Sequence, residues 1–159
     1  MASPEVVIRS ARIGDGAAAF DITRQSVEGL AGDFYTEQQI KGWMGTRTPE
    51  FYEALIARGR MFVAEREDGT VVAFVDTVPG EVTRMFILPE AAGQGLGSRL
   101  LALGIENASE GFSGLVKVEA TLNAVRFYEK HGFVILHHAL SSHDVGGATF
   151  EIIHMERRV

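Results

Sequence analysis

The chain has 159 residues, of which 46% are hydrophobic, and it carries a net charge of −6. The absence of cysteine excludes a disulfide framework and a Cys-based zinc site, and the acidic balance disfavours a nucleic-acid partner. The five histidines form no H-E-x-x-H pattern, so we expect no metal site. No apolar run approaches the roughly 18 residues of a membrane span, and the N-terminus lacks a signal-peptide core. We therefore expect one cytoplasmic domain that spans residues 1–159.

The first sixty residues predict one short strand and three helices. Val6–Arg9 is apolar enough for a strand, and Asp15 stands where it can cap a long helix with one apolar face. Thr36, followed by an acidic residue, begins a second helix. Thr48-Pro49 begins a third, since proline suits the first helical position, and this helix ends near Gly59.

Three strands joined by tight turns follow. Met61–Glu65 and Val71–Val78 flank the Asp68-Gly69 turn, an arrangement that is typical of a β-hairpin. Pro79-Gly80 turns the chain again, and Val82–Leu88 forms the third strand.

The second half of the chain alternates strands and helices. After a glycine-rich loop, Leu96, Leu100 and Leu103 share one face of a helix. The remaining predicted elements are a strand at Leu115–Ala120, a helix at Asn123–His131 closed by Gly132, and strands at Phe133–Leu140 and Thr149–Met155 joined by a loop with Gly146-Gly147. This order implies a mixed sheet with helices on its faces.

The main motif is the glycine-rich loop after Ile87-Leu88-Pro89. Gly93, Gly95 and Gly97 stand at alternate positions, where a missing side chain lets the backbone approach a ligand. The helix that follows starts with unpaired N–H groups and the positive end of its dipole, which attract phosphate. The pattern indicates a diphosphate cradle, with a flexible glycine connector as the alternative. It is neither a Walker A motif, which needs lysine, nor a G-x-G-x-x-G dinucleotide fingerprint.

Two blocks of the chain resemble the GNAT acetyltransferase superfamily. Ile87-Leu88-Pro89 followed by Gly95-Leu96-Gly97 is similar to the family's [RQ]-x-x-G-x-[GA] signature after a strand. Thr121–Phe133 is similar to its second block, N-x-x-A-x-x-F-Y-x-x-x-G-F, and Ile8–Asp15 resembles its first strand and helix start. Tyr35–Trp43, with Glu119-Ala120 before the second block, further resembles a bacterial subgroup whose acceptors are mostly unassigned.

The resemblance has two departures. Ala92 stands at the usual Arg or Gln position, and because the family holds the diphosphate mainly through backbone N–H groups, this implies weaker binding at most. In the second block Thr121 stands at the first Asn position, and Asn123 follows two residues later. Either side chain can then meet the pantetheine arm. We favour Asn123, for which a helix N-cap is the alternative role.

The resemblance implies an α/β fold. In this family a mostly antiparallel sheet of six to seven strands carries helices on both faces and splays between its two central parallel strands. The implied activity is transfer of an acetyl group from acetyl-CoA, the cosubstrate, to an amine of a small molecule or peptide. A noncatalytic acyl-CoA-binding sensor is the alternative, and a homodimer stays open.

The resemblance also implies which residues hold coenzyme A. Backbone N–H groups of the glycine loop would bind the pyrophosphate, and the preceding strand would pair with pantetheine as an added strand does. The N–H of Met85 would polarise the thioester carbonyl. The implied cofactor-binding residues are Met85, Phe86, Ile87, Gln94, Gly95, Leu96, Gly97, Ser98, Arg99 and Asn123.

Two proton movements define the candidate catalytic residues, Tyr128 and Glu81. Tyr128, in the second block, would donate a hydrogen bond to the leaving thiolate; a core aromatic is the alternative. Glu81 would take the amine proton, because an even spacing puts it on the same strand face as Met85. The alternative bases are Glu119, Asp76 and His143, of which Asp76 reads as a solvated strand residue and His143 as a loop residue.

The early helices carry a cluster of aromatic side chains. We expect most of them in the core and one or two of them against the acceptor. The cluster comprises Phe34, Tyr35, Trp43, Phe51 and Tyr52.

Overall fold

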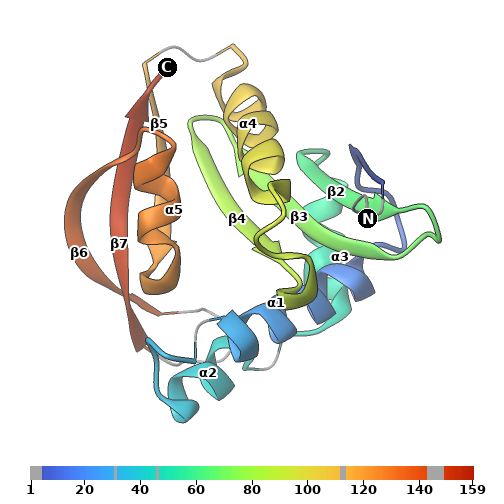
Figure 1. Cartoon of the computed structure of the whole chain (residues 1–159), viewed down its shortest axis with the longest axis horizontal. Coiled ribbons are helices and arrows are strands. Elements are labelled where there is room, and N and C mark those ends of the chain that lie inside the picture. Colours follow the sequence, from blue (N-terminus) through green and yellow to red (C-terminus); the bar gives the residue numbers. More distant parts are fainter. Residues whose placement is uncertain (1–4, 31, 46, 112–113, 143–148) are drawn as a thin grey trace.

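The computed structural model describes residues 5–30, 32–45, 47–111, 114–142 and 149–159 as five helices and a seven-stranded sheet (Figure 1). In chain order the elements are β1 (Val6–Ser10), α1 (Gly16–Leu30), α2 (Glu37–Met44), α3 (Pro49–Ala57), β2 (Met61–Arg66), β3 (Val71–Val78), β4 (Glu81–Ile87), α4 (Leu96–Ser109), β5 (Leu115–Thr121), α5 (Val125–Lys130), β6 (Val134–Ser142) and β7 (Thr149–Arg158). Each predicted element is present. The predicted helix from Asn123 begins later, as α5, after a 3-10 turn at Leu122–Ala124.

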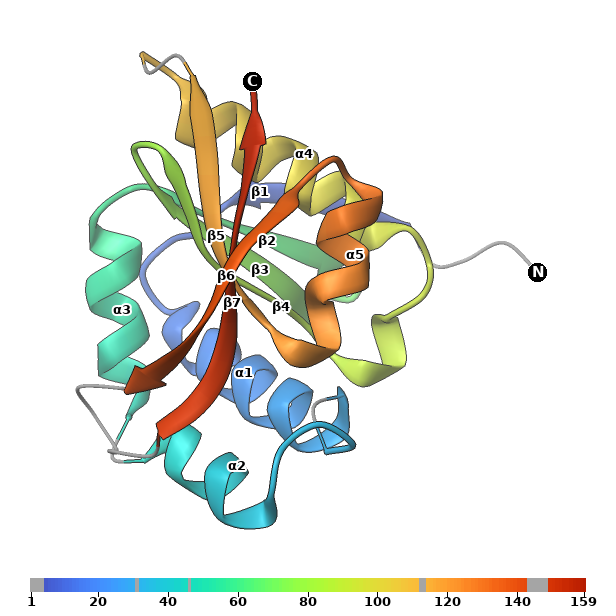
Figure 2. The same cartoon turned by 90° about the vertical axis from the view of Figure 1, so that its left-hand side faces the viewer.

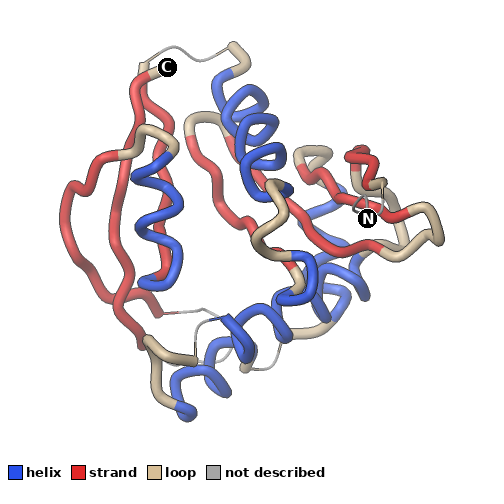
Figure 3. Tube along the Cα trace, in the orientation of Figure 1, coloured by secondary structure: helices blue, strands red, loops and turns tan. Residues whose placement is uncertain are grey.

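The sheet has the order β1-β2-β3-β4-β5-β7-β6, and β4 and β5 are the parallel pair among the described strands. That pair is short, because only Glu81 with Lys117 and Val82 with Val118 are in register. Beyond these residues the two strands diverge, so that β5, β7 and β6 form one wing of the sheet and β1 to β4 the other (Figures 1 and 3). The mostly antiparallel, splayed α/β sheet is therefore confirmed.

Helices cover both faces of the wing that β1 to β4 form (Figure 2). Neighbouring residues of β3 face opposite ways: the ring of Phe74 packs edge-on to Tyr52 of α3 with centroids 6.2 Å apart, whereas Val75 faces α4. A Cβ built on Gly104 of α4 would lie 2.9 Å from a methyl group of Val75 and 3.6 Å from one of Val82. This glycine lets α4 lie close against β3 and β4.

A bulge in β4 changes the face on which the candidate base lies. Arg84 pairs with Asp76 of β3 while Val82 pairs with Thr77, so Thr83 is the extra residue. Directly opposed residues share a face, and the bulge breaks the alternation of the strand. Glu81 therefore shares the face of Arg84, opposite to Met85, and the expectation from even spacing was wrong.

The helix starts agree in part with the expected caps. Thr36 forms a complete capping box with Gln39, as a threonine before a helix predicts. Asp15 does not cap α1: its carboxylate accepts from the N–H of Arg12, while the Glu53 carboxylate of α3 accepts from the N–H of Gly16 at 3.0 Å. A side chain 37 residues away thus satisfies the first N–H of α1, and the Asp15 carboxylate is used elsewhere.

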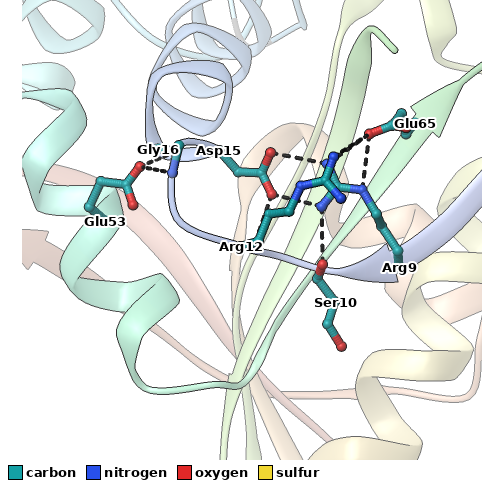
Figure 4. Close-up of polar contacts among 8 residues, drawn as sticks. Arg9, Ser10, Arg12, Asp15, Gly16, Glu53 and Glu65 are labelled. Carbon is teal, nitrogen blue, oxygen red and sulfur yellow. Dashed lines mark hydrogen bonds and ion pairs between the residues drawn. The ribbon is translucent and has the colours of Figure 1, made fainter. Parts of the chain in front are cut away.

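The Asp15 carboxylate instead belongs to an ion-pair network that fixes β1 to the start of α1 (Figure 4). Arg9 donates to Asp15 at 2.8 and 3.1 Å and to Glu65 of β2 at 2.7 and 2.9 Å. Burial alone would raise the pKa of Asp15, but hydrogen bonds from Arg9 and from the N–H of Arg12 outweigh it, so the pKa lies below its usual value. The network raises the pKa of Arg9, chiefly through Asp15.

Asp15→Asn should lower the free energy of unfolding by about 2 kcal/mol at pH 7, because it breaks a charge-assisted, partly buried network. A carboxylate with a depressed folded-state pKa stabilises the fold above its unfolded pKa of about 3.9, and that contribution is lost as pH falls further. The difference between the two proteins should therefore be constant from about pH 5 to pH 7 and shrink below about pH 4. Urea unfolding at several pH values measures it.

Asp21→Asn is the matched control for this prediction. Asp21 also pairs with an arginine, Arg24, but its side chain is 46% exposed, and exposed pairs contribute little. Equal losses of unfolding free energy in the two variants would show that the Arg9 network stabilises the fold no more than an exposed ion pair does.

Candidate functional site

Two adjoining pockets lie where β4 and β5 diverge. The first has a volume of about 410 Å³ and the second about 180 Å³. The residues that line both are Trp43, Met85, Phe86, Thr121 and Ala124. A molecule in the first pocket can therefore reach a molecule in the second beside the backbone of β4.

The glycine loop forms one end of the first pocket. Gly93 and Gly95 have φ of 78° and 81°, a conformation that side chains disfavour, and no atom lies within 4 Å of a Cβ built on either. Gly95 precedes the first residue of α4, a helix of 14 residues, without any side-chain cap. The first N–H groups of α4 are thus left for a ligand. This end fits a phosphate group.

The opposite wall of this end comes from α5. His131 accepts or donates at both ring nitrogens, to the carbonyl oxygen of Phe127 at 2.8 Å and to the hydroxyl of Ser98 at 2.9 Å. Lys130 lines the same pocket. A Cβ on Gly97 would lie 3.2 Å from both Ile87 and Phe127, so this glycine permits close packing between the loop, β4 and α5.

The predicted cofactor residues fall into two sets. Seven of them line the first pocket: Met85, Phe86, Ile87, Gly95, Gly97, Ser98 and Asn123. The other three, Gln94, Leu96 and Arg99, line a separate small pocket. The side chain of Gln94 donates to the carbonyl oxygen of Glu90, and that of Arg99 to the carbonyl oxygen of Val6. A role for these three residues therefore rests on their backbone.

Asn123 has the geometry of a ligand contact rather than of a helix cap. The residue before α5 is Ala124, which makes no side-chain cap. The Oδ1 atom of Asn123 is buried without a hydrogen-bond partner, although Asn123 lines the first pocket. An unpaired buried amide oxygen is costly, so an N–H donor from a ligand would stabilise it. Thr121, the alternative, lines both pockets.

Tyr128 and Glu119 line the second pocket. Tyr128 is 5% exposed, and its ring packs against those of Phe127 and Phe133 with centroids 5.4 and 5.5 Å apart. Burial raises the pKa of Tyr128, which keeps its phenol protonated through the neutral range. The side chain is a core aromatic that also lines the second pocket.

The candidate bases are placed differently. Glu119 lines the second pocket, whereas the lining residues do not include Glu81. Burial, followed by the negative charge of Glu119, raises the pKa of Glu81. Glu81 and Glu119 therefore act on one another as neighbouring carboxylates, with Glu119 nearer to the pocket.

The remaining two candidate bases are Asp76 and His143. Asp76 is not a solvated residue: it is 0% exposed and accepts from Arg58 at 2.7 Å and from Thr83 at 3.0 Å. Burial raises its pKa. The Asp76 carboxylate thus connects the bulge in β4, through Thr83, to the end of α3, through Arg58. His143 and Gly146-Gly147 lie outside the described residues.

Sequence reasoning missed several lining residues. Arg47 and Arg84 line the second pocket, and Ser26, Val27, Lys130 and His131 line the first. Trp43 of the aromatic cluster lines both pockets, and Phe34 is exposed. Lys130 and His131 follow Phe127 and Tyr128 by one helical turn, which places them beside this pair on the helix surface. This spacing is the sequence signal from which they could have been found.

In the described ranges no group of three or more His, Asp or Glu side chains could hold a metal ion. Nor does any helix in those ranges have the length and apolar character needed to cross a membrane.

The sequence is similar to known acetyltransferases. Residues 57–135 match the family model described as an acetyltransferase (GNAT) domain. An uncharacterized N-acetyltransferase of Escherichia coli K12, YafP, is 28% identical over 128 residues, which cover 80% of this chain and 81% of that protein.

The fold is shared with solved structures. A GCN5-related N-acetyltransferase from Rhodopseudomonas palustris gives a TM-score of 0.87 at 24% identity and covers 100% of this chain and 98% of that one. The PaiA N-acetyltransferase of Thermoplasma acidophilum, in complex with coenzyme A, gives 0.75 at 20% identity, with 98% and 99% covered. YncA of Salmonella typhimurium, with acetyl-CoA, gives 0.71 at 19% identity, with 97% and 94% covered.

Proposed function

Because this chain belongs to the GNAT acetyltransferase family, we propose that it moves the acetyl group of acetyl-coenzyme A to the amine of a small molecule or peptide. The observation that carries the proposal is the pair of adjoining pockets, one with a phosphate-binding end and one lined by Tyr128. They offer separate places for the acyl donor and the amine, side by side at Met85 and Phe86.

The first pocket fits coenzyme A in its chemistry. The backbone N–H groups from Gln94 to Arg99 would hold the pyrophosphate at the start of α4. Asn123, through its unpaired buried Oδ1, would accept from an N–H of the pantetheine arm. The N–H of Met85 would donate to the thioester carbonyl oxygen. Bound acetyl-CoA supplies the activated acyl group.

The chain's residues then manage the protons. The amine nitrogen attacks the thioester carbon, so a C–N bond forms and the C–S bond breaks; the amine loses one proton, and the thiolate gains one. An alkylammonium has a pKa of about 10.4, so only about one molecule in 10³ is a free amine at pH 7. Tyr128 donates to the leaving sulfur. Before the attack a carboxylate takes one proton from the ammonium group to give the free amine, and the candidates are Glu81 and Glu119.

Glu119→Gln and Glu81→Gln should separate these two roles. The wild-type enzyme can use the ammonium form above the pKa of its base, whereas a variant without the base must wait for free amine. The rate deficit of the base variant should therefore be largest at low pH and shrink toward about pH 10. The predicted base is Glu81, acting through a water past Glu119. The measurement is a pH–rate profile of both variants and the wild type with one acceptor.

The shape of the profiles decides the assignment. A deficit that is independent of pH in Glu81→Gln, together with a pH-dependent one in Glu119→Gln, moves the role to Glu119. Profiles parallel to the wild type in both variants leave deprotonation to solvent. Because the pKa of Glu81 is raised, we expect the acid limb of the wild-type profile above the ordinary range of a glutamate.

The overall proposal is tested by calorimetric binding of coenzyme A and by thiol release from acetyl-CoA with a panel of amines. Binding without turnover on any amine would favour the noncatalytic sensor. The cytoplasmic location, the single domain over residues 1–159 and the homodimer stay predictions.

A further inference from the structure

The second pocket is lined by more basic than acidic residues, whereas the chain as a whole is acidic. Its volume is about 180 Å³, and its charged lining residues are Arg47, Arg84 and Glu119. The chain carries a net charge of −6. Two arginine residues therefore line a small pocket of an acidic protein.

The two guanidinium groups lie together around one aromatic ring. The guanidinium carbon of Arg47 lies 4.9 Å from the ring centroid of Phe51, and that of Arg84 lies 5.5 Å from it. The ring offers a cation–π contact to both. Arg47 is 8% exposed and also contacts the hydroxyl of Tyr52 at 3.4 Å. Both cations are thus held in place by the fold.

The carboxylate that pairs with Arg84, that of Asp76, is already hydrogen-bonded to Arg58. Asp76 accepts from Arg58 at 2.7 Å through Oδ2, and the Arg84 guanidinium approaches the same oxygen at 3.5 Å. This longer contact leaves most of the five N–H donors of Arg84 for other acceptors. Arg84 lines the pocket, whereas Arg58 does not.

The same pocket has an acidic residue and a phenol among its lining residues, Glu119 and Tyr128. An ammonium group is favoured near a carboxylate, and a carboxylate is favoured near arginine, which binds it with two parallel hydrogen bonds. A molecule with an amine and a carboxylate close together satisfies both requirements within a small volume.

We propose that the acetyl acceptor is a small amino carboxylate, such as a free amino acid, whose carboxylate binds Arg84 beside the positive charge of Arg47 while its amine lies toward Glu119 and Tyr128. The proposal rests on the acetyl transfer proposed above. A polyamine fits this pocket poorly, because its second ammonium group would meet the two arginines.

Matched acceptors test this proposal with the unmodified enzyme. Free amino acids are compared with their carboxamides and with the corresponding decarboxylated amines, and thiol release from acetyl-CoA gives kcat/KM. The expected result is that some amino acids are used and that loss of the carboxylate lowers kcat/KM about 10-fold or more. Equal or better use of the neutral partners overturns the proposal. So does turnover of no amino acid by a protein that binds coenzyme A, whereas failure to bind coenzyme A contradicts the acetyl-transfer function itself.

A pair of variants separates recognition from structural support. Arg84→Met and Arg58→Met each remove an arginine that is paired with Asp76, but only Arg84 lines the pocket. Arg84→Met should raise KM for amino acids and abolish the preference over carboxamides, while Arg58→Met should keep that preference. If both variants keep the preference, Arg84 does not bind the carboxylate. Circular dichroism checks that each variant is folded, and the comparison in the wild type stands without them.

Discussion

Gly95→Glu should abolish coenzyme A binding, with an affinity loss of at least about 100-fold. Gly95 stands immediately before α4, where the first N–H groups of the helix have no side-chain cap. A glutamate there places bulk and negative charge where a diphosphate would lie, and it removes the favourable interaction of that anion with the helix N-terminus. Isothermal titration calorimetry with coenzyme A measures the loss.

The control must separate the loop from backbone strain. Gly95 has a φ of 81°, so any side chain there costs stability irrespective of the ligand. Gly59 has a φ of 76° and, like Gly95, no atom within 4 Å of an added Cβ, but it lines neither pocket. Gly59→Glu carries the same strain and charge and should bind coenzyme A as the wild type does. Unchanged affinity in Gly95→Glu would remove the loop from the site.

Elements were predictable where the determining residues are neighbours in the sequence. The Asp68-Gly69 turn and the Thr36 cap depend on contacts within three residues, and both are present. Asp15 shows the limit of this reasoning, because its carboxylate pairs with Arg9, and Glu53 of another helix accepts from the first N–H of α1. A cap can be read from local sequence only when the capping side chain has no stronger partner elsewhere in the fold.

The face of β4 on which Glu81 lies was not predictable for a similar reason. A strand pattern implies that every second residue shares a face, and this put Glu81 on the same face as Met85. The bulge at Thr83 reverses that relation, and a bulge is a property of the pairing between β3 and β4 rather than of either strand. The buried carboxylate of Asp76 lies at the same irregularity and accepts from Thr83.

The lining of the second pocket could not be read from the sequence either. The glycine loop and the second block are contiguous motifs, so their residues were identifiable from the resemblance to the family. Arg47 comes from the loop between α2 and α3, Arg84 from the bulged part of β4, and Glu119 from β5. None of these residues stands in a motif with the others, and only the splay of β4 from β5 brings them to one pocket.

Tyr128→Phe should lower kcat about 10²-fold or more while leaving the affinity for acetyl-CoA within a few-fold. Phenylalanine keeps the ring contacts with Phe127 and Phe133 and removes only the hydroxyl group. Because burial raises the pKa of Tyr128, the phenol stays protonated well above neutral pH, and its donor function should not titrate between pH 6 and about 9. The wild-type to variant rate ratio should therefore be constant over that range.

Tyr35→Phe is the matched control, because it removes the same atom from a tyrosine with a structural role. The Tyr35 hydroxyl donates to the carbonyl oxygen of Glu151 at 2.7 Å and accepts from the N–H of Leu122 at 2.8 Å. Its loss should reduce stability by about 1 kcal/mol or more and change kcat little. Steady-state kinetics and urea unfolding of both variants give the two readouts. If Tyr128→Phe folds and acetylates at the wild-type rate, the Tyr128 ring is a packing residue and the leaving thiolate takes its proton from solvent.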